Sequence, residues 1–242
     1  MKRLEEYITL NESRSDNLKP TNKRELEKLI NQRIKEQGPN CDLNDIDVSR
    51  VTDMSYLFEG SKFNGDISQW DVSRVKNMSF MFKDSEFNGD ISKWDVSNVT
   101  NMVCMFWNSR FNGDISQWDV SRVRYIGSMF RESRFSGDIS DWDMSKVEDM
   151  SGMFAESQFN GDIAKWNVSK VRDMVDMFEG SKFNGDISKW DTSKVEDMRG
   201  MFWNSIFAGD ISKWDVSNVK KMSHMFKGSP LEGNEPSWYV DK

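Results

Sequence analysis

Carboxylates recur every 24 residues in two columns, and rows of carboxylates can bind calcium between the turns of a repeat protein. The first column is Asp42, Asp66, Asp90, Asp114, Asp138, Asp162, Asp186 and Asp210, and the second is Asp47, Asp71, Asp95, Asp119, Asp143, Asn167, Asp191 and Asp215. Like charges one strand spacing apart, ~4.8 Å, repel by roughly 0.9 kcal/mol even in water. Something in the fold must therefore offset the repulsion within each column.

Two arrangements would do this. In the first, each neighbouring pair of repeats holds a calcium ion. In the second, the first-column Asp accepts backbone amides in its Asn-Gly turn, and the second-column Asp is balanced by a Lys or Arg three residues later, as at Arg74, Arg122, Lys146, Lys170 and Lys194. We favour the second arrangement, because no repeat has a second cluster of carboxylates or the spacing of an EF-hand. We therefore expect neither a metal site nor a cofactor.

Catalytic chemistry is not expected from this chain. An active site needs unlike groups that converge in a hollow, whereas a regular repeat places the same group in rows. His224 is the only histidine, and the repeats contain no irregular loop that would bring a nucleophile or a second base to it. The recurring Asn-Gly-Asp is a turn signal and not a phosphate loop. The expectation is a protein that is not an enzyme.

A single repeat of 24 residues accounts for most of the chain. Phe-Asn-Gly-Asp-Ile-Ser-Gln-Trp-Asp-Val-Ser begins at Phe63 and returns, nearly unchanged, at Phe87, Phe111, Phe135, Phe159, Phe183 and Phe207. Residues 39–62 form a degenerate first repeat, so residues 39–230 comprise eight repeats without an insertion. A fixed period of this length is typical of a solenoid, whose units bury their apolar faces by stacking.

Within the repeat, position 1 is the Phe, and the apolar positions predict one strand and one helix. Positions 8–10, for example Trp70-Asp71-Val72, alternate as a short strand does. Ser at position 11 would cap a helix whose buried face is positions 13, 16, 19 and 20. The predicted fold is an α/β solenoid, a right-handed leucine-rich-repeat-like stack of strand–helix units with a short parallel sheet. The Trp at position 8 is expected in the core, although an exposed Trp column would suit sugar binding.

The two ends depart from the repeat. Thr21 or Asn22 would cap a helix that runs to Gln37, and residues 21–38 would cover the first repeat as an N-terminal cap. Residues 231–242 are a truncated ninth unit that would seal the other end. Residues 1–20 are polar and are expected to be flexible.

Composition narrows the possible partners. The chain has 242 residues and a net charge of −7, and residues 39–242 carry nine more acidic than basic side chains. This charge disfavours nucleic acid and anionic membranes. No apolar run is long enough to span a bilayer, and no signal peptide is seen, which favours a cytoplasmic or phage-associated protein over a secreted one. Cys41 and Cys104 lie far apart in the stack, so a disulfide between them is not expected.

The repeat Phe-Asn-Gly-Asp-Ile-Ser-x-Trp-Asp-Val-Ser-x-Val-x-x-Met-x-x-Met-Phe resembles the BspA-like (DUF285-type) leucine-rich-like repeat of bacterial surface proteins and mycoplasma lipoproteins. The resemblance covers residues 39 to about 240. It implies a non-catalytic adhesion or interaction protein. The chain departs from surface members of that family in having no lipobox cysteine and no wall-anchoring tail.

The expected helix would point positions 14, 18, 21 and 22 outward, and these columns vary between repeats. Large side chains on them are the candidate binding residues: Tyr56, Phe80, Cys104, Trp107 and Trp203. Clustered exposed aromatic residues are typical of protein interfaces. The sequence thus predicts a protein-binding module with an unidentified partner. A self-assembling structural or virion component, and a glycan-binding adhesin, are the alternatives.

Overall fold

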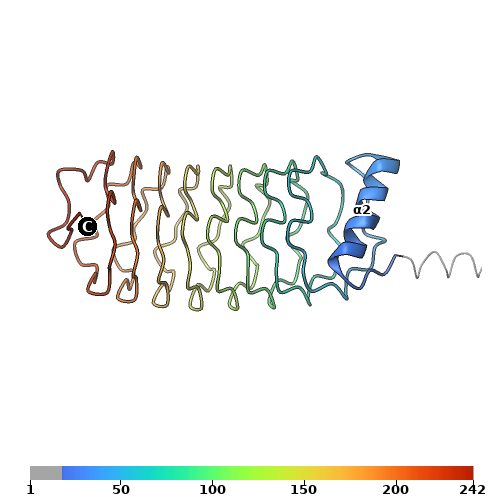
Figure 1. The fold of residues 1–242 in the computed structure, drawn as a ribbon, viewed down its shortest axis with the longest axis horizontal. Helices are drawn as coiled ribbons and strands as arrows, with labels where there is room; N and C mark the ends of the chain where they lie inside the picture. The colour runs from blue at the N-terminus through green and yellow to red at the C-terminus, as the bar shows by residue number, and fades with distance from the viewer. Residues whose placement is uncertain (1–17, 242) are drawn as a thin grey trace, which may run out of the picture.

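The computed structural model describes residues 18–241, which form an elongated stack of coils with one helix across its N-terminal end (Figure 1). Each coil is one 24-residue repeat. Coil 1 is residues 39–62, coil 2 is 63–86, and the series continues to coil 8, residues 207–230. The flexibility expected for residues 1–20 concerns mainly residues 1–17, which lie outside the described part.

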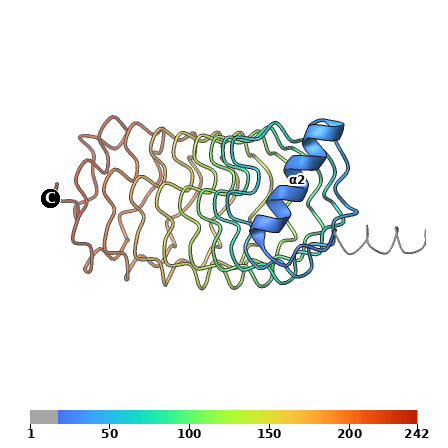
Figure 2. The same cartoon turned by 45° about the vertical axis from the view of Figure 1, so that its right-hand side comes forward.

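The helix is α2, Lys23–Gln37, and its limits agree with the predicted N-terminal helix. Asn22 is the N-cap, and its side-chain oxygen accepts from the amide of Glu25 at 3.1 Å. The Glu25 carboxylate in turn accepts from the amide of Thr21 at 2.8 Å. Leu26 and Ile30 are buried in the same core as the first coil, so α2 covers the apolar end of the stack (Figure 2).

The predicted α/β solenoid with a strand and a helix in each repeat is wrong. Among residues 18–241, α2 is the only helix, and no strand is longer than an isolated bridge. Each coil is instead a chain of β-turns. In coil 2, the amide of Trp70 donates to Ile67, that of Val75 to Val72, and that of Met81 to Met78.

The β-turn explains why the sequence pattern resembled a helix. A turn closes with a hydrogen bond between residues three apart, and in these turns both of those residues are apolar and buried. The same spacing of three is half of the helical signature. Ser at position 11 is not a helix cap. It lies inside a turn, and the amide of Ser73 donates to the carboxylate of Asp71 at 3.1 Å.

Successive coils are joined by backbone hydrogen bonds in the segment that was expected to be helical. The amides of Met78, Phe80 and Phe82 donate to carbonyl oxygens of coil 3, where a helix would have used oxygens four residues earlier. Parallel bridges at position 15, such as Asn77↔Asn101, run through the whole stack. The expected strand at positions 8–10 contains none of the bridges found in residues 18–241.

The core is built from stacked columns of aromatic residues. Phe82 packs on Phe87 with ring centroids 4.5 Å apart and on Phe106 of the next coil at 5.7 Å. The Trp at position 8 is 3–4% exposed in coils 2 to 8, which confirms its placement in the core. At the C-terminal end, Trp238 continues this column and Tyr239 packs edge-on against Phe226 at 5.0 Å.

Candidate binding surface

One face of the stack has residues of widely different size and charge from coil to coil. It consists of positions 14, 15, 17, 18, 21 and 22 of every coil, and we call it the turn face. Positions 16, 19 and 20, which alternate with it, hold Met and Phe side chains that are buried in the core, as at Met78, Met81 and Phe82. The regular core columns therefore hold the turn face in register from coil to coil.

Two residues of each coil on this face have left-handed backbone conformations. Position 18 has φ of +61° at Tyr56 and +60° at Phe80, and position 22 has φ of +55° at Asp84. Both positions are the third place of a β-turn that closes three residues apart, and type II turns require a positive φ there. Large aromatic residues seldom adopt this conformation, whereas Gly200 at position 18 of coil 7 does so readily.

Tyr56 and Phe80 form an aromatic pair on the turn face of coils 1 and 2. Their rings are parallel within 5° with centroids 4.6 Å apart, and Tyr56 is 46% exposed. The ammonium of Lys23, at the start of α2, lies 5.0 Å from the Tyr56 ring centroid. The structure therefore brings these two predicted residues together as a surface ridge.

Cys104 does not belong to that exposed ridge, contrary to the prediction. It occupies position 18 of coil 3, next in the column after Phe80, but it is buried. Burial raises the pKa of its thiol to about 11. Both Cys41 and Cys104 are free cysteines. The small Cys side chain lies below the surface that the larger residues of coils 1 and 2 form.

Trp107 is half-buried at position 21 of coil 3, between cations from the coils before and after. Lys83 Nζ lies 5.0 Å and the Arg131 guanidinium 5.8 Å from a Trp107 ring centroid. The indole N–H donates to the carboxylate of Glu132 at 3.3 Å. Because these cations lie over its ring, Trp107 has the edge of the ring, and not an open ring face, available to a ligand.

Trp203 is separate from the other aromatic residues. It lies at position 21 of coil 7, is 37% exposed, and has His224 as its ring neighbour at 6.4 Å. The amide of His224 donates to the carboxylate of Asp241 at 3.1 Å. The candidate residues thus fall into an N-terminal group, coils 1 to 3, and one isolated residue.

Sequence reasoning missed the acidic part of the turn face. In coils 5 to 7 this face carries eight carboxylates and two arginines, and we call it the acidic band. The carboxylates are those of Glu148, Asp149, Glu156, Asp173, Asp176, Glu179, Glu196 and Asp197. Aligning the repeats by position would have found this band, since the residues fall at positions 14, 15, 18, 21 and 22.

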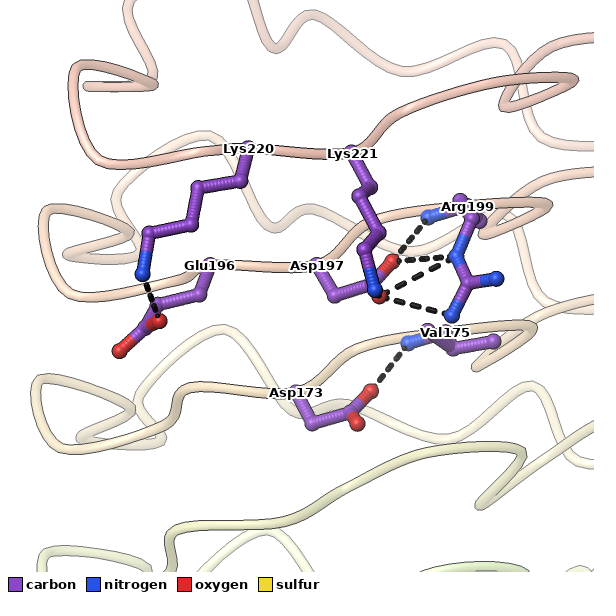
Figure 3. A network of polar contacts seen from close by, with 7 residues as sticks. All are labelled: Asp173, Val175, Glu196, Asp197, Arg199, Lys220 and Lys221. Atoms are coloured by element: carbon purple, nitrogen blue, oxygen red, sulfur yellow. Dashed lines mark hydrogen bonds and ion pairs between the residues drawn. The ribbon is translucent and has the colours of Figure 1, made fainter. Parts of the chain in front are cut away.

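Cations balance only part of the acidic band. Arg199 and Lys221 contact the carboxylate of Asp197 at 2.8 and 3.6 Å (Figure 3). In contrast, the Asp173 carboxylate accepts the amide of Val175 at 2.9 Å and forms no ion pair with a described residue. Asp176 forms none with a described residue either. Desolvation, with Asp149 and Asp197 nearby, raises the pKa of Asp173, and desolvation also raises that of Asp176.

The carboxylates of the two Asp columns, which lie outside the turn face, accept hydrogen bonds from backbone amides of their own turns. Asp114 accepts the amide of Ser116 at 2.9 Å, and Asp119 accepts that of Ser121 at 3.0 Å. Hydrogen bonds of this kind hold the pKa of Asp114 below its usual value. The expected Lys and Arg counter-ions at position 12 form no ion pair in residues 18–241. The pKa of Asp119 is lowered mainly by its hydrogen bonds from Ser121, and the charges of Arg122 and Lys146 add a smaller effect. Within the same range, no group of three or more His, Cys, Asp or Glu side chains is arranged to hold a metal ion.

Two segments of the chain, residues 26–137 and 128–238, match the family model described as "Mycoplasma protein of unknown function, DUF285". The chain belongs to this family. The match agrees with the resemblance inferred from the repeat motif. No curated protein and no solved structure matches the chain.

Over residues 18–241, no helix has the length and apolar character needed to cross a membrane.

Proposed function

We propose that the protein is a non-catalytic interaction module that binds another protein through its turn face. The single observation that carries the proposal is the Tyr56–Phe80 pair. These aromatic side chains occupy left-handed positions, which are costly for them; Tyr56 is nearly half exposed and Phe80 is partly accessible. A position that is filled by Gly in other coils gains nothing for the core from an exposed aromatic ring, so a partner is the simplest reason for it.

The nature of the turn face supports protein over glycan recognition. Sugar-binding sites use the open face of an aromatic ring. Here the Tyr56 ring has Phe80 and Lys23 as neighbours, and the Trp107 ring has cations from two other coils. The Trp column at position 8, which the glycan alternative would need at the surface, is in the core. Ring edges and half-buried side chains suit a protein surface, where aromatic residues supply much of the binding energy.

The test uses a variant that removes both rings without straining the backbone. Asn is among the residues that best tolerate positive φ, so Tyr56→Asn/Phe80→Asn is expected to fold. Ile206→Ser is the matched control, since Ile206 is 47% exposed and lies outside the turn face. A partner purified with the wild-type protein should lose most of its affinity for the double variant and keep it for the control. Equal affinity of all three proteins would exclude this surface.

A further inference from the structure

We propose that the turn face binds a protein segment with an apolar anchor at one end and Lys or Arg residues at the other, lying along the axis of the stack. The anchor contacts the Tyr56–Phe80 pair and the basic end lies over coils 5 to 7. The inference rests on the proposed function and specifies its partner.

The apolar end of this surface is nearly neutral. In the same coil as Phe80, the ammonium of Lys83 lies 3.2 Å from the Glu59 carboxylate and 3.3 Å from that of Asp84. The turn face of coils 1 and 2 carries Lys76 and Lys83 together with the carboxylates of Asp53, Glu59 and Asp84. Lys23, beside the Tyr56 ring, is itself paired with Glu27 at 3.7 Å and adds no net charge, so this end neither attracts nor repels a charged partner strongly. The accessible edges of the Tyr56 and Phe80 rings are therefore the main contact that this end offers, and they favour an aliphatic or aromatic side chain of the partner.

The other end of the surface is acidic and incompletely neutralised. Four of its eight carboxylates form ion pairs, with Arg124, Arg131, Arg172 and Arg199 among their partners. The other four form no ion pair with a described residue, and all are at least partly accessible: Asp149, Glu156, Asp173 and Asp176. A guanidinium or ammonium group placed over coils 5 and 6 would pair with these carboxylates, whereas an acidic partner would be repelled.

The distance between the two ends sets the length of the partner segment. Phe80 lies in coil 2 and Asp176 in coil 6, four coils apart in the same column. At ~4.8 Å per coil the separation is about 19 Å, which a helix of about 13 residues spans. One short amphipathic segment therefore reaches both ends.

The experiment measures binding of fluorescent synthetic helical peptides, about 16 residues long to allow for fraying. The first peptide has leucines at one end and lysines at the other. The second has glutamates in place of the lysines, and the third has the composition of the first with leucine and lysine evenly mixed. We expect the first peptide to bind most tightly, with an affinity that falls as salt increases.

Two matched charge variants then locate the site. Asp149→Asn/Asp173→Asn/Asp176→Asn removes three charges from the acidic band, and Asp90→Asn/Asp114→Asn/Asp138→Asn removes three from the first Asp column. Asn keeps the turn hydrogen bond, as Asn167 shows by accepting the amide of Ser169 at 3.1 Å. The first variant should weaken binding of the lysine peptide on the order of tenfold, and the second should change it little.

Equal binding of the lysine and glutamate peptides, or equal effects of the two charge variants, would overturn the inference. Tighter binding of the mixed peptide would contradict the separation into two ends. These failures are distinguishable from failure of the proposed function, because a natural partner that depends on Tyr56 and Phe80 but ignores the charge variants would leave the proposed function standing.

Discussion

The indole N–H of Trp142 donates a hydrogen bond to the carbonyl oxygen of Ile115, in the preceding coil, at 3.1 Å. The same oxygen accepts the amide of Trp118 at 3.2 Å. Equivalent bonds recur from coil to coil, as at Trp166 and Ile139. Each Trp therefore fills the core and also ties its coil to the one before.

Replacing Trp142 separates these two contributions. Trp142→Ala leaves a cavity between close-packed coils and should lower the free energy of unfolding by about 3–5 kcal/mol. Trp142→Phe keeps much of the volume but loses one hydrogen bond, and should cost less than the alanine variant. Chemical denaturation measures both. Near-wild-type stability of Trp142→Ala would show that the Trp column is not part of the core.

Alanine at a left-handed glycine should also destabilise the stack. Gly60 has φ of +63° and open space where a methyl group would lie, so Gly60→Ala should cost about 1–2 kcal/mol from backbone strain alone. Gly152 has φ of +59°, and an added Cβ would lie 2.8 Å from Ser128 Oγ. Gly152→Ala should therefore cost more than Gly60→Ala. Denaturation curves compare the two variants, and a gain in stability in either would contradict the left-handed turns.

The raised pKa values of Asp173 and Asp176 predict how stability depends on pH. A carboxyl whose pKa is higher in the folded protein than in the unfolded chain destabilises the fold once pH rises through that interval. Asp173→Asn/Asp176→Asn should therefore be more stable than wild type at pH 7, and the difference should vanish below the ordinary Asp pKa of about 3.9. Urea denaturation at several pH values measures it. If the difference in unfolding free energy between the variant and wild type did not change with pH, the pKa values of Asp173 and Asp176 would not be raised in the folded protein.

Removal of calcium should leave the fold unchanged. The carboxylates of both Asp columns accept amides within their own turns, as Asp66 accepts that of Ser68 at 2.9 Å. These hydrogen bonds require no metal ion. The midpoint of thermal unfolding is therefore expected to be the same with and without a chelator. A large fall of this midpoint on adding the chelator would instead indicate that calcium ions bind between neighbouring repeats.

The sequence predicted the repeat, the core columns and α2, but not the shape of one coil. Asn22 and Glu25 carry the local capping signal of a helix, and Trp70 recurs in a column that only a stack can bury. Met78 and Met81 did not distinguish a turn from a helix, because both place apolar residues three apart. A positive φ at Tyr56 was unforeseen, since aromatic residues rarely adopt it.

The binding surface was predicted only in part. Phe80 was assigned to an outward stripe with the correct neighbour, Tyr56, but Cys104 was expected to be exposed and is buried. How deeply a side chain lies depends on the size of its neighbours in adjacent coils, which periodicity alone does not reveal. The lack of an ion pair at Asp173 likewise depends on where Arg199 and Lys221 place their charges.

The most direct measurement is photo-crosslinking of the protein to its purified partner from two matched positions. Lys76 is exposed at position 14 of the turn face, and Lys93 is exposed at position 7, on a different part of the coil. A photoreactive amino acid at either place leaves the core and the turns intact. We predict a covalent adduct with the partner from position 76 and none from position 93. Adduct formation from position 93 alone would show that the protein binds through another face.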